Sequence, residues 1–301
     1  MENSDYILHR RFDRMGRLVG DDSMIKLFKS HVMVLGLGGV GSWAAESLAR
    51  SGVGKITLVD HDEICITNAN RQLHALQGLV GQKKAQVMAD RLKKINPQAE
   101  IQVVAEFYNK DSADKILDLK PDFILDAIDN LSAKTHLLNQ CRVRDMKVIT
   151  SAGASAKWDP TRIRIVDLAD TVVDPLAHSV RKILRQEYNF PRKGQFGVPC
   201  VFSDEEVSEP IELKYDNGQG FKCVCPQGEI DPHGCLHRSV IYGTASFVTG
   251  AFGLAMASWT VRQIAQPEVQ LMTQLTPKQK RKGRVPKMIS PIITEAPAIS
   301  I

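Results

Sequence analysis

A glycine-rich turn between an apolar run and a helical segment constrains the fold of this chain more than any other feature. The apolar run 31–35 leads into Gly36-Leu37-Gly38-Gly39-Val40-Gly41-Ser42, and residues 42–51 have the apolar spacing of a helix. A second apolar run, 55–59, ends at Asp60. A strand–turn–helix–strand unit of this kind binds phosphate at the helix N-terminus and a ribose hydroxyl on the acid. The sequence therefore predicts a nucleotide-binding unit built on parallel strands.

Short apolar runs alternate with helical segments through the first half of the chain. Two short helices are expected over 6–30, before the first strand. The strands are expected at 31–35, 55–59, 101–105, 123–126 and 148–151, and the helices at 42–51, 83–95, 112–119 and 132–144. This alternation predicts an α/β fold with a Rossmann-like, doubly wound, mostly parallel sheet.

The pattern changes after about residue 150. Residues 157–159 and 162–166 are expected to form a hairpin, Asp174-Pro175 to start a helix that reaches residue 188, and 197–203 to form a strand. We interpret these elements as an antiparallel C-terminal extension of the same sheet. The expected organisation is one domain over 1–266, with an ATP-binding core at about 30–151 and a C-terminal subdomain at about 152–266.

An uncharged stretch, 239–261, lies between Arg238 and Arg262. Its length would suffice to cross a bilayer of about 30 Å. The stretch is, however, rich in glycine, alanine, serine and threonine, which suits close helix packing in a core or a subunit interface. We therefore favour packing, and association with a membrane through this helix is the alternative.

The net charge of +5 comes from one end of the chain. Residues 278–287 hold six cations and no acid, and Glu295 is the one charged residue after them. We expect 267–301 to be a basic, flexible tail, with weak attraction to nucleic acid or anionic membrane as the alternative to a solvated end.

The six cysteines show no paired framework, and the chain starts with polar and acidic residues instead of a signal peptide. We therefore expect free thiols and a cytoplasmic protein. Cys223, Cys225 and Cys235 lack the second close pair that structural zinc sites use, so zinc at these residues is a minor alternative.

Cations near the glycine turn favour ATP over NAD as the bound nucleotide. Hydride transfer does not need cations beside the phosphates, whereas nucleotidyl transfer does, because charge builds on the α-phosphate and on the leaving pyrophosphate. Arg71 and Lys84 fit that role, with solvated surface charge as the alternative. Asn68 and Asn70 are interpreted as holding the Arg71 loop or contacting phosphate.

Two acids, Asp126 and Asp129, lie at the carboxyl end of the strand expected at 123–126, at the edge where open α/β sheets bind ligands. Asp129 is placed to hold Mg²⁺ on the triphosphate, and an N-cap of the helix that follows is its competing role. Asp126 is expected to be structural and to bond a nearby loop. Arg11 and Arg14 lie far upstream, from where an N-terminal segment can reach a site across a dimer interface.

Over residues 10–166 the chain resembles the ThiF/MoeB/HesA family of ubiquitin-activating-like adenylyltransferases. The matching pieces, in order, are Arg11-Phe12-Asp13-Arg14, the turn 36–42, Asp60-His61-Asp62, Asn68-Ala69-Asn70-Arg71-Gln72, Gly81-Gln82-Lys83-Lys84, Ile95-Asn96-Pro97 and Asp126-Ala127-Ile128-Asp129. The family adenylates a carboxylate with ATP and Mg²⁺. The resemblance implies ribose binding by Asp60, magnesium binding by Asp129 and a homodimer in which the partner subunit supplies the Arg14 side chain.

The resemblance also assigns the candidate site residues. The expected catalytic residues are Arg14, Arg71, Lys84 and Asp129. The expected nucleotide-binding residues are Gly36, Gly38, Gly39, Gly41, Ser42, Asp60, Asp62, Asn68, Arg71, Gln72 and Lys84.

Further segments extend the likeness to about residue 264, among them Asp174-Pro175-Leu176-Ala177 and Cys200-Val201-Phe202-Ser203. They resemble family members that cyclise N6-threonylcarbamoyladenosine in tRNA through a carboxyl-adenylate, releasing AMP and pyrophosphate. The implied partner is tRNA. Basic residues that would contact it, or form a solvated face, are Arg181, Lys182, Arg185, Arg192 and Lys193.

Other activities give different expectations. Activation of the C-terminus of a sulfur-carrier or ubiquitin-like protein is the main alternative, and the absence of paired C-x-x-C motifs weighs against it. Proteins of a sulfur-relay or cysteine-desulfurase system are a further class of expected partner. An NAD-dependent oxidoreductase would have no use for Lys84, and a non-catalytic scaffold would release no AMP. Residues 226–237 match nothing in the family.

Overall fold

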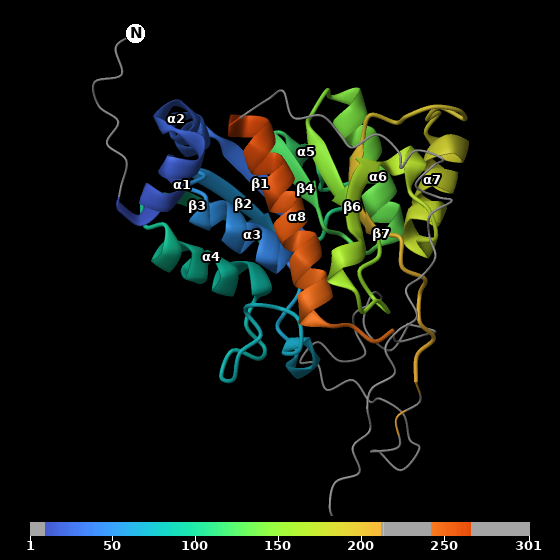
Figure 1. Ribbon diagram of the computed structural model, residues 1–301, viewed down its shortest axis with the longest axis horizontal. Coiled ribbons are helices and arrows are strands. Elements are labelled where there is room, and N and C mark those ends of the chain that lie inside the picture. The colour runs from blue at the N-terminus through green and yellow to red at the C-terminus, as the bar shows by residue number, and fades with distance from the viewer. Residues whose placement is uncertain (1–9, 212, 214–241, 266–301) are drawn as a thin grey trace, which may run out of the picture.

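The computed structural model describes residues 10–211, 213 and 242–265. In this part of the chain one sheet has the strand order β3-β2-β1-β4-β5-β7-β6 (Figure 1). The strands are β1 (His31–Leu35), β2 (Lys55–Val59), β3 (Glu100–Val104), β4 (Phe123–Asp126), β5 (Val148–Ser151), β6 (Ile163–Asp167) and β7 (Pro199–Ser203). All neighbouring strands are parallel except β6 and β7, which pair antiparallel. The predicted doubly wound, mostly parallel sheet is therefore confirmed.

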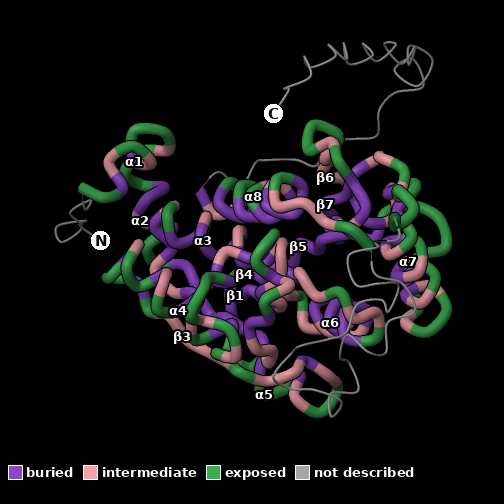
Figure 2. Tube along the Cα trace, turned by 90° about the horizontal axis from the view of Figure 1, so that it is seen from below, coloured by how far each residue is buried: buried purple, intermediate pink, exposed green. Residues whose placement is uncertain are grey.

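Helices cover both faces of this sheet. They are α1 (Asp13–Val19), α2 (Asp21–Lys29), α3 (Gly41–Arg50), α4 (Lys84–Ile95), α5 (Ala113–Leu117), α6 (Leu131–Val143), α7 (Pro175–Glu187) and α8 (Ser246–Ala265). One apolar core joins the sheet to α2, α3, α4 and α8, and a second joins it to α5, α6 and α7. Figure 2 shows the buried strands between α3 and α8 on one side and α5 and α6 on the other. The helices and strands predicted from residue 31 through residue 151 are present within two residues of their expected bounds, and the two short helices expected over 6–30 are α1 and α2, which begin at Asp13.

Helix α8 packs across α3 through small residues. A Cβ atom added to Gly253 would lie 2.3 Å from the Val40 carbonyl oxygen, and one added to Gly250 would lie 3.2 Å from the Trp43 ring. This close approach confirms the predicted packing in a core. The membrane alternative for 239–261 is not supported, because no helix among residues 10–211 and 242–265 is long and apolar enough to cross a membrane.

The hairpin predicted over 157–166 is wrong. The Trp158 and Asp159 amides donate to the Glu205 carboxylate, at 2.8 and 2.9 Å, so they do not enter a strand ladder. Asp159 in turn accepts from the Thr161 amide and caps a 3₁₀ helix, Pro160–Arg162. Strand β6 instead pairs with β7, which is itself parallel to β5. The antiparallel part of the extension is thus limited, in the described residues, to the β6–β7 pair.

Several expectations fall on residues that the structure does not describe. They are the basic tail over 267–301, the segment 226–237 and the cysteines at 223, 225 and 235. Cys65, Cys141 and Cys200 are buried and form no disulfide with one another, as predicted. The division into a core of about 30–151 and a subdomain of about 152–266 stays a prediction.

Candidate functional site

The glycine turn at the carboxyl end of β1 is tightly enclosed. Gly36 has φ of +84°, and a Cβ atom there would lie 2.8 Å from the Ala127 carbonyl oxygen. At Gly41 a Cβ atom would lie 1.8 Å from the Gly36 carbonyl oxygen, so the turn cannot close around any larger residue. At Gly38 the same atom would approach the Gln72 side chain only to 4.0 Å. The turn therefore leaves no space for a side chain at Gly36 and Gly41, whereas the space beside Gly38 is open.

Helix α3 starts directly from this turn, with Val40 at its N-cap. A valine side chain has no acceptor for the first helical amides, which suits a helix end that receives an anion. The Ser42 hydroxyl is fully buried and accepts a hydrogen bond from the Leu73 amide at 3.3 Å. Ser42 therefore ties the turn to the following loop in this structure.

Asp60 directly follows β2, and its side chain holds the glycine turn through hydrogen bonds. Its carboxylate accepts hydrogen bonds from the Leu37 amide at 2.6 Å and from the Asp62 amide at 2.8 Å. Burial of this side chain raises the pKa of Asp60, an effect that the charge of Lys84 opposes. The acid predicted for a ribose thus lies against the glycine turn, as the motif requires.

Lys84, the first residue of α4, is nearly buried. Its ammonium group donates to Asp62 Oδ2 at 2.6 Å. Burial alone would lower the pKa of Lys84, but the carboxylates of Asp60, Asp62 and Asp129 outweigh it and raise the pKa above its ordinary value. Lys84 is therefore a fixed cation among three acids rather than a solvated surface charge.

Asp60, His61 and Asp62 also form a compact group whose ligand atoms lie within 4.8 Å of one another. The Asp62 carboxylate is engaged by Lys84 and lies 3.1 Å from His61 Nε2, and the Asp60 carboxylate is engaged by backbone amides. These partners account for the group, and we assign no metal to it.

The loop after β2 places Arg71 beside the turn. A Cβ atom on Gly39 would lie 3.2 Å from Arg71 Cγ, and the Arg71 guanidinium donates to the Thr67 carbonyl and the Asn70 side chain. Asn68 accepts from the Cys65 amide at 3.0 Å and so shapes the loop. Asn68 and Asn70 therefore hold the Arg71 loop, which was one of the two predicted roles.

The loop after β4 carries the predicted magnesium ligand. Asn130, and not Asp129, caps α6 by accepting from the Ala133 amide at 3.0 Å. The competing N-cap role predicted for Asp129 is therefore wrong, and its exposed carboxylate acts electrostatically on Lys84. Asp126 is structural, as predicted, because its carboxylate accepts from the Ile128 amide in this loop.

The structure does not bring Arg14 to this site within one chain. Arg14 is exposed on α1, whose neighbours Phe12 and Met24 pack near Gly52, just beyond the C-terminal end of α3. The glycine turn lies at the opposite end of that helix. The expected contribution of Arg14 from a partner subunit stays a prediction.

Two buried groups near the site were missed by sequence reasoning. Lys134 of α6 is 1% exposed and donates to Asp126 Oδ2 at 2.7 Å. His74 is 1% exposed, shares a hydrogen bond with Gln72 Oε1 at 3.1 Å, and has its pKa lowered to about 3 by burial and by the charges of Lys84 and Arg91. A lysine at helical spacing and a histidine in a loop give no sequence signal of burial, so neither was found.

The turn, the buried cation and the exposed acid together define a nucleotide-binding α/β protein whose site is equipped for phosphate chemistry. The model of the ThiF family matches residues 12–290, and the chain belongs to this family, as the sequence predicted. The tRNA threonylcarbamoyladenosine dehydratase of Haemophilus influenzae is 37% identical over 85% of this chain and 93% of that protein. Its Bacillus subtilis counterpart is 44% identical over 70% of this chain and 79% of that protein.

A solved structure gives the same likeness in three dimensions. The Escherichia coli tRNA N6-threonylcarbamoyladenosine dehydratase TcdA, in complex with ATP, superposes with a TM-score of 0.73 and 35% identity. The match covers 86% of this chain and 97% of that one. The same protein has been solved in complex with AMP.

Proposed function

We propose that this chain is a tRNA threonylcarbamoyladenosine dehydratase, which cyclises N6-threonylcarbamoyladenosine in tRNA at the expense of ATP. One observation carries the proposal: the chain matches nearly the whole length of enzymes with that name, including 97% of an ATP-bound one. The local geometry supports it, since a glycine turn, Arg71, Lys84 and Asp129 gather around the N-terminus of α3.

The first step would be adenylation of the threonyl carboxylate. A carboxylate oxygen attacks the α-phosphorus of ATP, a P–O bond forms, and the bond to the leaving pyrophosphate breaks. The open side of the turn at Gly38 and the first amides of α3 would bind phosphate oxygens. Arg71 and Lys84 would offset the charge that develops on the phosphates, an effect that preorganised groups supply at low reorganisation cost.

Asp129 fits the role of a magnesium ligand. Its carboxylate is exposed at the carboxyl edge of the sheet, and helix capping does not use it because Asn130 takes that role. Magnesium bound with the triphosphate neutralises phosphate charge and orients the leaving group. The Asp129 carboxylate also acts electrostatically on Lys84, so magnesium held there would share the phosphate charge with that cation.

The second step would close the ring. A ureido nitrogen of the same side chain attacks the acyl carbon, AMP leaves, and the nitrogen loses its proton. Both reacting groups belong to one substrate, so positioning supplies the acceleration and no enzyme nucleophile is needed. The sum of the two steps removes one water from the modified adenosine.

The proposed assembly is a homodimer in which the second copy supplies Arg14 to the phosphates. This arrangement would complete a site that lacks Arg14 within a single chain. The candidate tRNA contacts on and after α7, sulfur-relay partner proteins and a cytoplasmic location stay predictions.

Activation of a sulfur-carrier protein is the second candidate activity. It is supported by similarity to the adenylyltransferase and sulfurtransferase MOCS3 of Culex quinquefasciatus, which is 35% identical over 45% of this chain and 31% of that protein. The shared part corresponds to less than half of the chain, so this candidate has less support.

Nucleoside mass spectrometry tests the proposal. Purified protein is incubated with ATP, Mg²⁺ and tRNA that carries the threonylcarbamoyl group, and the digested nucleosides are compared with those from a reaction without ATP. We expect the modified adenosine to lose the mass of one water, with one AMP formed per ring closed. An unchanged nucleoside, together with AMP formation on a carrier protein that ends in Gly-Gly, would replace this proposal by the second candidate.

A further inference from the structure

We propose that Trp158, with Phe247 beside it, forms a stacking platform for an unpaired base of the tRNA substrate. The platform would hold a nucleotide next to the one that is modified, and it rests on the proposed function. Nothing in the adenylation chemistry uses either ring, so the assignment adds a recognition surface to the site.

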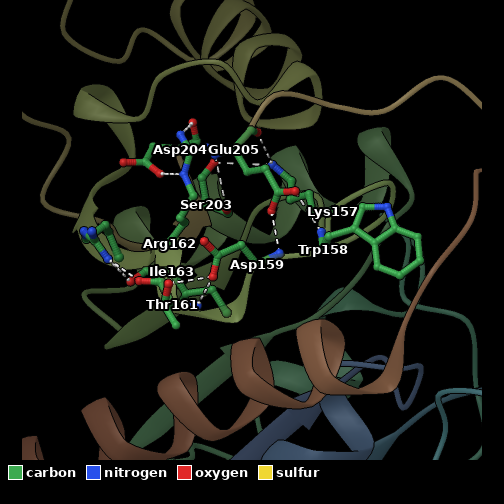
Figure 3. A network of polar contacts seen from close by, with 10 residues as sticks. Lys157, Trp158, Asp159, Thr161, Arg162, Ile163, Ser203, Asp204 and Glu205 are labelled. Atoms are coloured by element: carbon green, nitrogen blue, oxygen red, sulfur yellow. Dashed lines mark hydrogen bonds and ion pairs between the residues drawn. The ribbon is translucent and has the colours of Figure 1, made fainter. Parts of the chain in front are cut away.

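The backbone that carries Trp158 is rigidly held. Lys157 is 3% exposed, and its ammonium group donates to the Ser203 and Glu205 carbonyls, both at 3.3 Å, and lies 3.3 Å from Asp174 Oδ2. The Glu205 carboxylate accepts from the Trp158 amide at 2.8 Å. Figure 3 shows the contacts of Lys157 and Trp158 with Ser203 and Glu205 on one side, with the indole of Trp158 pointing away from them.

The two rings are unusually exposed for their size. Trp158 is 70% exposed and Phe247 is 52% exposed, with ring centroids 6.3 Å apart and planes inclined by 37°. Packing among the described residues does not account for an indole that leaves most of its surface in water, and large exposed apolar groups tend to mark binding surfaces. Because the backbone is already fixed, an incoming ring would meet a preorganised surface.

The platform borders the nucleotide site. Its two segments are joined where the Ala156 amide donates to the Gly243 carbonyl at 2.7 Å. The segment before Phe247 is tied to the Arg71 loop, because Asn70 Nδ2 donates to the Thr244 carbonyl at 2.9 Å. One turn into α8, Thr249 lies 3.1 Å from the position of a Cβ atom on Gly39. A nucleotide on the platform would thus lie beside the turn where ATP is proposed to bind.

The charges around Trp158 favour a base over a phosphate group. The nearby cations Lys157 and Arg162 are each paired, with Asp174 and Asp204 respectively. A phosphate would have to compete with these carboxylates, whereas the neutral face of a base would not. Unpaired bases of RNA loops are commonly held by stacking on aromatic side chains, and every base offers a face for it.

Three variants of the full-length protein test the platform. Trp158→Ala removes the ring, Trp158→Phe keeps an aromatic face, and Val143→Ala removes a comparably exposed apolar group (69% exposed) at the far end of α6. The Michaelis constants for modified tRNA and for ATP are measured for each. We expect Trp158→Ala to raise the constant for tRNA by about 5- to 150-fold, the range for loss of one stacked base, with that for ATP unchanged. Trp158→Phe and Val143→Ala should stay within about two-fold of the starting protein.

A second measurement separates this inference from the proposed function. Fluorescence anisotropy of a labelled anticodon stem-loop, without ATP, reports binding alone. Weaker binding by Trp158→Ala but not by Val143→Ala supports the platform even if no cyclisation is found. An unchanged Michaelis constant for tRNA in an active Trp158→Ala enzyme overturns it. A fall in molecular mass of Trp158→Ala by sedimentation would also overturn it, because the rings would then belong to a subunit interface.

Discussion

Lys134 and Asp126 form an ion pair at 2.7 Å in which the two side chains are 2% and 0% exposed. The pair joins α6 to the end of β4, and Thr150 of β5 completes it with bonds to both partners. The second oxygen of Asp126 accepts from the Ile128 amide at 3.1 Å. The loop that carries Asp129 is therefore fixed to the sheet by a buried cation in the first turn of α6.

Replacing Lys134 by methionine tests this support. Lys134→Met leaves the Asp126 carboxylate buried without its cation, so we expect the free energy of unfolding to fall by about 3–5 kcal/mol. Urea denaturation measures this loss. The double variant Lys134→Met/Asp126→Asn removes both charges and should recover part of the stability. A double variant that is as unstable as the sum of the two single ones would show that the pair is not coupled.

Gly38 and Gly41 are expected to respond differently to the same change. In Gly41→Ala the new methyl group would lie 1.8 Å from the Gly36 carbonyl oxygen, so the turn must shift and both stability and ATP binding should be lost. In Gly38→Ala the nearest atom would be 4.0 Å away, so the protein should fold normally. If phosphate approaches Gly38, that methyl group will still weaken ATP binding. Thermal melting without ATP measures the stability of each variant, and the rise in melting temperature on adding ATP measures nucleotide binding. If ATP stabilised Gly38→Ala as much as the starting protein, the phosphate would not lie at Gly38.

Asp129→Asn should impair catalysis without impairing folding. The carboxylate is exposed and does not cap α6, so its interactions are screened by solvent and its loss should lower the free energy of unfolding by no more than about 1 kcal/mol. AMP formation should fall by about 10²- to 10³-fold, the typical cost of removing one electrostatic group from a reacting centre. Raising the Mg²⁺ concentration should restore part of the rate. A rate that is insensitive to Mg²⁺ in the variant and in the starting protein would contradict the assignment.

Lys84→Met should impair both folding and catalysis, in contrast to Asp129→Asn. The lysine is nearly buried between Asp60 and Asp62, whose charges would be left without a cation. The loss of stability should be smaller than at Lys134, because the Asp62 side chain is 39% exposed and partly screened. AMP formation should be undetectable even at temperatures where circular dichroism shows the variant folded. Normal AMP formation by that folded variant would remove Lys84 from the mechanism.

The sequence predicted the sheet well because apolar runs and glycine turns are local signals. It placed β1, β2, β4 and β5 at their observed bounds, and Asp174 is the observed N-cap of α7. It failed where a distant residue decides the outcome. The strand expected at 157–159 is absent because Glu205, more than forty residues later, takes its amides.

In the candidate site, too, the features with local sequence signals were predicted and those set by distant residues were not. Glycine spacing and the acid after β2 are local, and the structure brings them together with Arg71, Lys84 and Asp129 around one turn. The buried contacts that hold these residues in place come from distant parts of the chain. Lys134 is buried only because Asp126 and Thr150 come from two neighbouring strands, and no helical pattern reports that. A role for Arg14 in the site would need a second chain and stays a prediction.

His74 predicts how the stability of the protein depends on pH. Its pKa is lowered from the ordinary 6.5 to about 3, because burial and the charges of Lys84 and Arg91 disfavour the protonated ring. Between these two values the unfolded chain binds a proton that the folded protein does not, so stability is full above pH 6.5 and falls as the pH drops toward 3. The slope from this one group is about 1.4 kcal/mol per pH unit. Urea denaturation at several pH values should show a shallower fall for His74→Gln, which keeps a polar partner for Gln72 but cannot be protonated. Parallel curves for the two proteins would mean that other groups set the acid limit.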